Sequence, residues 1–194
     1  MSTHPVMSSK IPVPAGASPN GDGLIIGSGS VVVDAFVDFL CPFCKMFEDR
    51  SRPTLERLLL EGAITMVYHP LGFLDRLSTS HYSSRASAAS AAASDVGKFA
   101  PYKDALFANQ PQEGGPGLDD NELVELGRAA GIDEPEFATF ADAVFSGTYL
   151  AWTAYVTELA IEAGIGGTPT VLVAGMAVPA NPTTIEAAVR DLSS

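Results

Sequence analysis

Hydrophobic residues form two apolar runs in the first half of the chain, separated by a stretch with helical spacing. The run VVVDAFVDFL (31–40) is β-branched, aromatic and almost continuously apolar, which is typical of a strand buried on both faces. The run AITMVYHP (63–70) predicts a second strand that ends at its proline. Between them, FCKMFEDRSRPTLERLLLEG (43–62) predicts a helix, in which Pro53 should cause a kink or a restart. This order of strand, helix and strand predicts a βαβ unit with parallel strands.

The middle of the chain has a different character, because no strand pattern occurs between residues 73 and 164. Its first part is rich in alanine and helical in pattern, and the glycine- and proline-rich segment 111–117 predicts a loop. Three more helices should follow, the first capped by Asp119 or Asp120, whose side chains can accept from free N–H groups of the first turn.

The strand pattern returns near the C-terminus. TPTVLVAG (168–175) predicts a strand, MAVPA (176–180) a short antiparallel partner, and TTIEAAVRDL (183–192) an amphipathic closing helix. LIIGSGS (24–30) predicts one more short strand near the start. The sequence therefore predicts an α/β fold in the order βαβ, helices, ββα, with a helical insertion over about 76–163.

Residues 1–23 are rich in serine, proline and glycine, and we expect them to form a flexible leader before a domain at 24–194. They lack a positively charged start followed by an apolar stretch, so no signal peptide is visible. The expected location is the cell envelope or another extracytoplasmic compartment if an export signal was removed, and the cytoplasm otherwise.

Composition narrows the function classes. The chain has 194 residues, of which 46% are hydrophobic, enough for the core of one domain. Its formal net charge of −12 repels phosphate backbones and disfavours nucleic-acid binding. No run of 18 or more apolar residues occurs, so we expect no membrane span in this chain.

Both cysteines lie in FVDFLCPFCKMFEDR (36–50), as Cys41-Pro42-Phe43-Cys44 directly after the first predicted strand. A structural zinc site usually needs four ligands, but there is no second cysteine pair and the histidines are scattered. A disulfide closing so short a loop would stabilise the fold little. A redox dithiol fits the placement better, because free N–H groups at a helix N-terminus stabilise a thiolate at Cys41. Cys44, one turn later, would then be a buried resolving thiol.

These residues resemble the DsbA-like proteins of the thioredoxin superfamily, which carry a helical insertion. The resemblance extends to VYHPLGFLD (67–75), YSSRASAA (82–89) and GIGGTPTVLVAG (164–175), and its active-site part comprises Phe36, Asp38, Phe39, Cys41, Pro42, Phe43 and Cys44. It implies thiol–disulfide exchange with cysteine-containing protein substrates and a redox partner protein that recycles the dithiol, without a cofactor or metal.

The resemblance also assigns roles. Cys41 would be the exposed nucleophile and Cys44 the resolving thiol, and the two would form the redox-active disulfide. The substrate would bind at Pro42, Phe43 and the loop of Thr168 and Pro169, with a cis bond between those two residues. That geometry would leave the Thr168 backbone free to pair with an extended substrate segment.

One position departs from the resemblance, since relatives often carry a buried acid where this chain has Ala35. Asp38 matches a family acid, although by itself it reads as a loop carboxylate at a strand end. Proton transfer to Cys44 would then use water or another group, with Lys45, Glu48 and Glu158 as candidates. The alternative function is a non-catalytic binding module on a DsbA-like scaffold. A glutathione-dependent enzyme would be favoured by serine in place of Cys41, which is not present.

Overall fold

The computed structural model describes residues 11–192, and these residues form a five-stranded sheet with helices on both faces. The strand order is β1-β3-β2-β4-β5, in which β2 and β3 are parallel and the other neighbours antiparallel. The strands are β1 (Leu24–Gly27), β2 (Val31–Val37), β3 (Ile64–Pro70), β4 (Thr170–Val173) and β5 (Met176–Val178). The predicted βαβ and ββα units are both present.

The helix between the two parallel strands, α1 (Pro42–Leu60), is continuous through Pro53. The expectation of a restart at this proline is therefore wrong. A proline inside a helix removes one hydrogen bond to the carbonyl four residues earlier. That carbonyl belongs to Asp49, and both Asp49 and Pro53 are exposed, so water can replace the lost bond.

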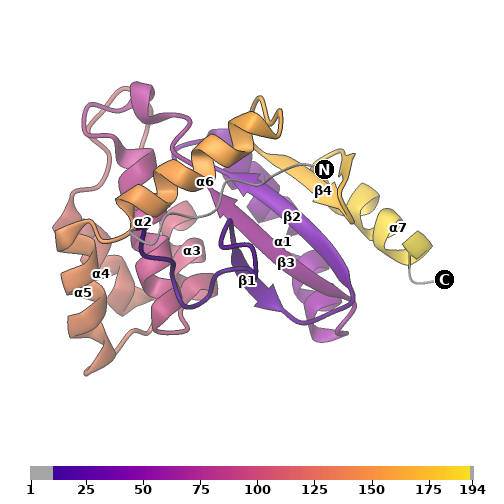
Figure 1. The fold of residues 1–194 in the computed structure, drawn as a ribbon, viewed down its shortest axis with the longest axis horizontal. Coiled ribbons are helices and arrows are strands. Elements are labelled where there is room, and N and C mark those ends of the chain that lie inside the picture. The colour runs from indigo at the N-terminus through magenta and orange to yellow at the C-terminus, as the bar shows by residue number, and fades with distance from the viewer. Residues whose placement is uncertain (1–10, 193–194) are drawn as a thin grey trace.

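Five helices lie between β3 and β4, and Figure 1 shows four of them, α2 to α5, gathered at one end of the molecule. The first of these helices follows the short 3-10 helix η1 (Asp75–Leu77). Asp119 forms a capping box with Glu122 at the start of α4, as one of the two predicted caps. The five are α2 (Tyr82–Asp95), α3 (Phe99–Ala108), α4 (Asp120–Ala129), α5 (Glu136–Ser146) and α6 (Leu150–Glu162), and α7 (Pro182–Leu192) closes the chain.

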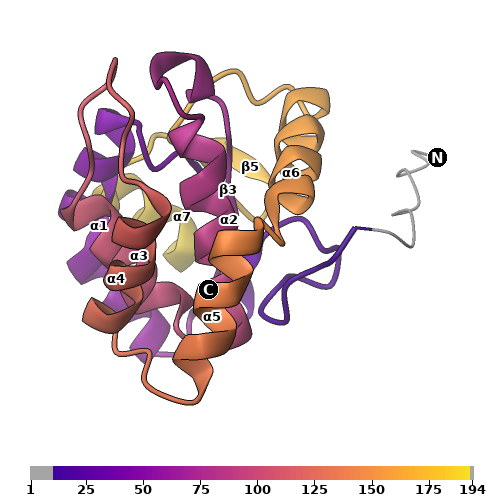
Figure 2. The same ribbon diagram turned by 90° about the vertical axis from the view of Figure 1, so that its left-hand side faces the viewer.

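The sheet lies between two helical layers. Helices α1 and α7 contact each other on one face, and α6 packs against β3 on the other, as the two perpendicular views show (Figures 1 and 2). The central strands β2 and β3 are mostly buried, as their apolar sequences predict. No helix among residues 11–192 is both long and apolar enough to cross a membrane.

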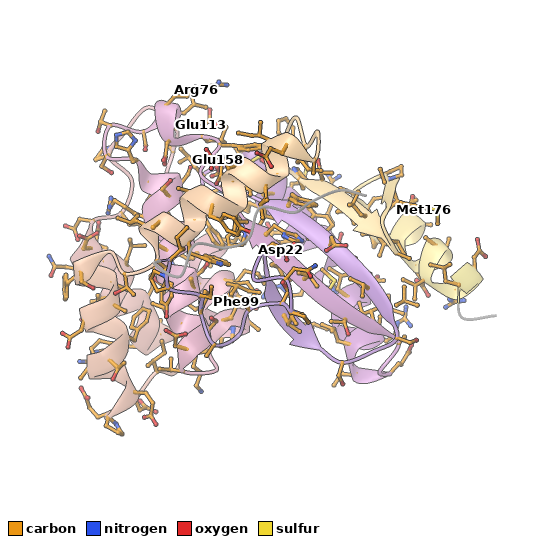
Figure 3. All side chains as sticks on the ribbon, viewed as in Figure 1. Asp22, Arg76, Phe99, Glu113, Glu158 and Met176 are labelled. Atoms are coloured by element: carbon orange, nitrogen blue, oxygen red, sulfur yellow. The ribbon has the colours of Figure 1, made fainter. Side chains whose placement is uncertain are left out.

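The N-terminal segment differs from the expectation. Residues 11–23 follow the domain surface, where Trp152 Nε1 on α6 donates to the Gly21 carbonyl at 2.7 Å. The Ala15 N–H donates to Asp95 at 2.7 Å, and the carbonyl of Asp22 lies 2.6 Å from His69 Nδ1. Figure 3 labels Asp22 in front of the sheet. The expectation of a leader separate from the domain is thus wrong for residues 11–23, because their backbone groups form hydrogen bonds with the domain. Residues 1–10 lie outside the described range.

Candidate active site

Cys41 occupies the junction between the central strand β2 and helix α1. It is the N-cap residue of α1, with extended backbone angles (φ −74°, ψ 116°), and Pro42 is the first helical residue. Proline suits this position because its missing N–H would have had no partner inside the helix. The free N–H groups of the first turn therefore face the Cys41 side chain, as the sequence predicts.

The sulfur of Cys41 is less accessible than expected. Both cysteines are free thiols, and Cys41 is only 4% exposed. Its Sγ lies 3.4 Å from the carbonyl oxygen of Thr168, whose loop packs over the sulfur from the other end of the sequence. The expectation of an exposed nucleophile is therefore wrong for this dithiol state, although the neighbouring Phe43 is 64% exposed.

Several donors converge on Cys41 and lower the pKa of its thiol from 9.0 to about 6. The largest contribution is a hydrogen bond from the Cys44 thiol, and burial acts in the opposite direction. The Thr168 side chain and the backbone N–H groups of Cys44 and Phe43 also stabilise the thiolate. At neutral pH most Cys41 side chains are then thiolates, the form that attacks disulfides.

Cys44 has the opposite character. It is fully buried, and burial raises the pKa of its thiol well above 9.0, an effect to which its hydrogen bond to Cys41 adds. The backbone N–H of Asp38 points at its sulfur over 3.4 Å. One sulfur is thus held as a thiolate and the other as a neutral donor, and this is the asymmetry of an attacking and a resolving thiol.

Asp38 directly follows β2, as expected of a carboxylate in the loop at a strand end, but it is fully buried. Its two oxygens accept hydrogen bonds from the backbone N–H groups of Leu40 and Leu74, both at 2.9 Å, and from the Ser83 hydroxyl at 2.7 Å. Burial raises its pKa from 3.8 to about 6 in spite of these donors. Asp38 joins the strand end, the loop after β3 and helix α2, while Ala35 is buried and apolar.

The three candidates for proton transfer lie in different surroundings. Lys45 pairs with Asp49 at the surface, and Glu158 is exposed on α6, where Figure 3 labels it. Glu48 is buried and pairs with Lys103 of the helical insertion. Within residues 11–192, no hydrogen bond joins any of these three side chains to either cysteine.

Sequence reasoning missed Gln110, which follows α3 in the insertion. Its side-chain amide donates to the carbonyls of Phe39 and Cys41, each at 3.0 Å. These carbonyls belong to the turn that carries the first cysteine. No sequence motif marks the residue, because its role depends on the insertion folding back onto the end of β2.

A groove of about 340 Å³ lies beside the cysteines. The Thr168–Pro169 bond in its wall is cis, the isomer that the resemblance implies. Of the expected substrate-binding residues, Phe43, Thr168 and Pro169 line the groove and Pro42 does not. The complete lining is Phe43, Met46, Phe47, Arg50, Thr168, Pro169, Ala180 and Asn181. The described part of the chain contains no cluster of three or more side chains suited to hold a metal ion.

The chain is similar in sequence and in fold to known proteins. Residues 20–191 match the family described as Thioredoxin. The reduced disulfide bond oxidoreductase DsbG of Mycobacterium tuberculosis is 32% identical in sequence, with a TM-score of 0.75 over 96% of this chain and 85% of that one. Reduced DsbA of the same organism is also 32% identical in sequence, with a TM-score of 0.75 over 96% of this chain and 90% of the DsbA chain. BdbD of Bacillus subtilis has the same TM-score at 20% identity, which indicates a shared fold.

A curated relative is the serine/threonine-protein kinase PknE of Mycobacterium tuberculosis, 30% identical over 166 residues. The match covers 81% of this chain, which spans only 29% of the length of that kinase. The family match covers most of the chain, including the strand–CPFC–helix junction and the loop before β4. The chain therefore belongs to the thioredoxin family, in the form that carries a helical insertion and resembles the disulfide oxidoreductases of Mycobacterium tuberculosis.

Proposed function

We propose that this chain is a thiol–disulfide oxidoreductase that exchanges disulfides with cysteine-containing proteins through Cys41 and Cys44. The observation that carries the proposal is the asymmetry of the two thiols at one helix N-terminus. The pKa of Cys41 falls to about 6 while that of Cys44 rises well above 9.0. The DsbG structure of Mycobacterium tuberculosis, which is 32% identical in sequence, is described as a disulfide bond oxidoreductase, and this supports the same activity here.

In the oxidising direction, a substrate thiolate attacks the sulfur of Cys41 in the Cys41–Cys44 disulfide. The bond between the two cysteines breaks, and Cys44 leaves and takes up a proton. A second substrate thiolate then attacks the substrate sulfur of the mixed disulfide, and Cys41 leaves as a stabilised thiolate. Two electrons have passed from the substrate to the protein, so a partner with a disulfide of its own must accept them before the next cycle. Reduction is the same sequence in reverse.

The groove gives the substrate a place beside Cys41. We assign the Thr168 backbone to pairing with an extended substrate segment, and Phe43 and Pro169 to contacting its apolar side chains. In the dithiol the Thr168 carbonyl oxygen lies 3.4 Å from the Cys41 sulfur, so a substrate sulfur that Cys41 attacks must displace this contact.

Trapping tests the assignment of roles. Cys44→Ser should accumulate a mixed disulfide with a protein substrate that carries scrambled disulfides, because the Cys41 thiolate attacks a substrate disulfide, a substrate thiolate leaves, and no second thiol of the variant resolves the product. Cys41→Ser should accumulate almost none, since its remaining cysteine is buried. Non-reducing gels and intact mass spectrometry measure both variants. Equal trapping would contradict the roles, and a wild-type protein that exchanges no disulfide would favour the non-catalytic binding module.

A further inference from the structure

The groove beside the dithiol carries a single charged side chain, that of Arg50. Phe43, Met46 and Arg50 follow one another at helical spacing, so they lie along one face of α1. Phe43 and Met46 are exposed apolar residues, and Arg50 is exposed at the far end of this row. The opposite wall is formed by the Thr168–Pro169 loop and the segment before α7.

The side chain of Arg50 has no hydrogen bond or ion pair with another residue in the range 11–192. Other cations of α1 are already engaged, Lys45 with Asp49, Arg52 with Asp104 and Arg57 with Glu61. The guanidinium group of Arg50 is therefore an unpaired positive charge in a protein whose net charge is −12. A positive group kept unpaired on such a surface, in a groove, favours a carboxylate on the occupant.

From these observations we infer that the groove selects extended segments whose reactive cysteine is followed or preceded by an acidic residue that pairs with Arg50. The inference rests on the proposed function and adds the chemistry of the substrate. Arg50 lies nine positions after Cys41, which corresponds to roughly 14 Å along the helix axis. An extended peptide rises about 3.3 Å per residue, so the acid belongs about four residues from the cysteine. Apolar residues between them would lie over Phe43 and Met46.

The test uses the Cys44→Ser variant, in which Cys41 is the one remaining cysteine. Single-cysteine peptides carry 2-nitro-5-thiobenzoate as a mixed disulfide, with glutamate or lysine four residues from the cysteine on either side. The Cys41 thiolate attacks the peptide sulfur and thiobenzoate leaves, which its absorbance reports. The measured quantity is the second-order rate constant of the glutamate peptide divided by that of the matching lysine peptide. The intrinsic reactivity of Cys41 cancels in this ratio.

At low salt the glutamate peptide should react about fivefold faster on the side that reaches Arg50, a size typical of an exposed ion pair. Salt should reduce the ratio. Arg50→Glu should invert the ratio and Arg50→Lys should retain the preference. Arg128→Glu is the matched control, since it makes the same change of charge on α4, at the other end of the molecule from α7 (Figure 1).

Two results would overturn the inference while leaving the proposed function intact. One is a ratio that Arg50→Glu does not change, and the other is a ratio that Arg128→Glu changes equally. If Cys41 releases thiobenzoate from none of the peptides, the proposed function is refuted, and the inference with it.

Discussion

The low pKa of Cys41 should depend mainly on the Cys44 thiol that donates to it, and two substitutions separate this donor from the rest of the site. Cys44→Ala removes the donor, whereas Cys44→Ser replaces it with a hydroxyl that can donate in the same direction. Each variant retains one cysteine, so every titration reports Cys41 alone. The backbone N–H groups of the helix and the Thr168 side chain stay in place in both.

The expected size follows from the strength of the lost bond. A hydrogen bond to a charged group contributes about 1.5–3 kcal/mol, and about 1.4 kcal/mol corresponds to one pKa unit. Cys44→Ala should therefore raise the pKa of Cys41 from about 6 to roughly 7–8. Cys44→Ser should leave it near 6. At pH 7 the alanine variant would be alkylated more slowly than the serine variant, because less of its Cys41 is thiolate.

The rate of alkylation by iodoacetamide between pH 4 and pH 10 measures both values, and the absorbance of the thiolate provides a second readout. In denaturant, both variants should titrate at the value of an unfolded cysteine, which shows that the fold causes the shift. If folded Cys44→Ala and Cys44→Ser titrate at the same pH, the helix terminus and Thr168 account for the low pKa instead. A wild-type pKa above 8 would refute the thiolate assignment itself.

Three further predictions concern other parts of the site. The wild-type reduction potential should lie between about −270 and about −120 mV, and Phe43→His should raise it because the imidazolium cation stabilises the Cys41 thiolate. Equilibration with glutathione measures both potentials, and about 30 mV corresponds to a tenfold change in the equilibrium constant. An unchanged potential would contradict this prediction. Burial raises the pKa of Asp38 from 3.8 to about 6, so the free energy of unfolding of the wild-type protein should fall as the pH rises through this window, by about 3 kcal/mol once the pH is above both values; urea unfolding of Asp38→Asn should lack this loss. Deletion of residues 1–23 should cost about 3 kcal/mol in urea unfolding, through three lost hydrogen bonds, and shift Trp152 emission to longer wavelength. Deletion of residues 1–10 keeps those bonds, and equal effects of the two deletions would refute the prediction.

The sequence was sufficient to predict the strands, the βαβ unit and the position of Cys41 at the start of a helix. Each of these depends on local patterns, namely an apolar run, a proline at the first helical residue and two cysteines three residues apart. The same local information indicated the cap at Asp119. Asp34 accepts from His69 Nε2 at 2.9 Å, whereas its neighbour Ala35 is fully buried, because successive residues of a strand point to opposite faces.

The remaining features depend on contacts between distant segments. Asp38 is ordinary in sequence and becomes a buried acid only because Ser83 and Leu74 fold over it. Gln110 reaches the active-site turn from 69 residues away. Residues 11–23 are poor in large apolar side chains, and they attach to the domain through backbone groups, which carry no sequence signal. Thr168 likewise covers Cys41 although the two residues are 127 positions apart in the sequence.

The hydrogen bonds from Gln110 have a consequence for protein engineering. A shortened protein that joins β3 directly to β4 would keep all five strands and both cysteines. It would also lose Gln110, Ser83 and Leu74, and so leave the carbonyls of Phe39 and Cys41 and both oxygens of Asp38 without these donors. The insertion is therefore not a removable module, and grafting CPFC onto a minimal thioredoxin scaffold would transfer the motif without the donors that hold its turn.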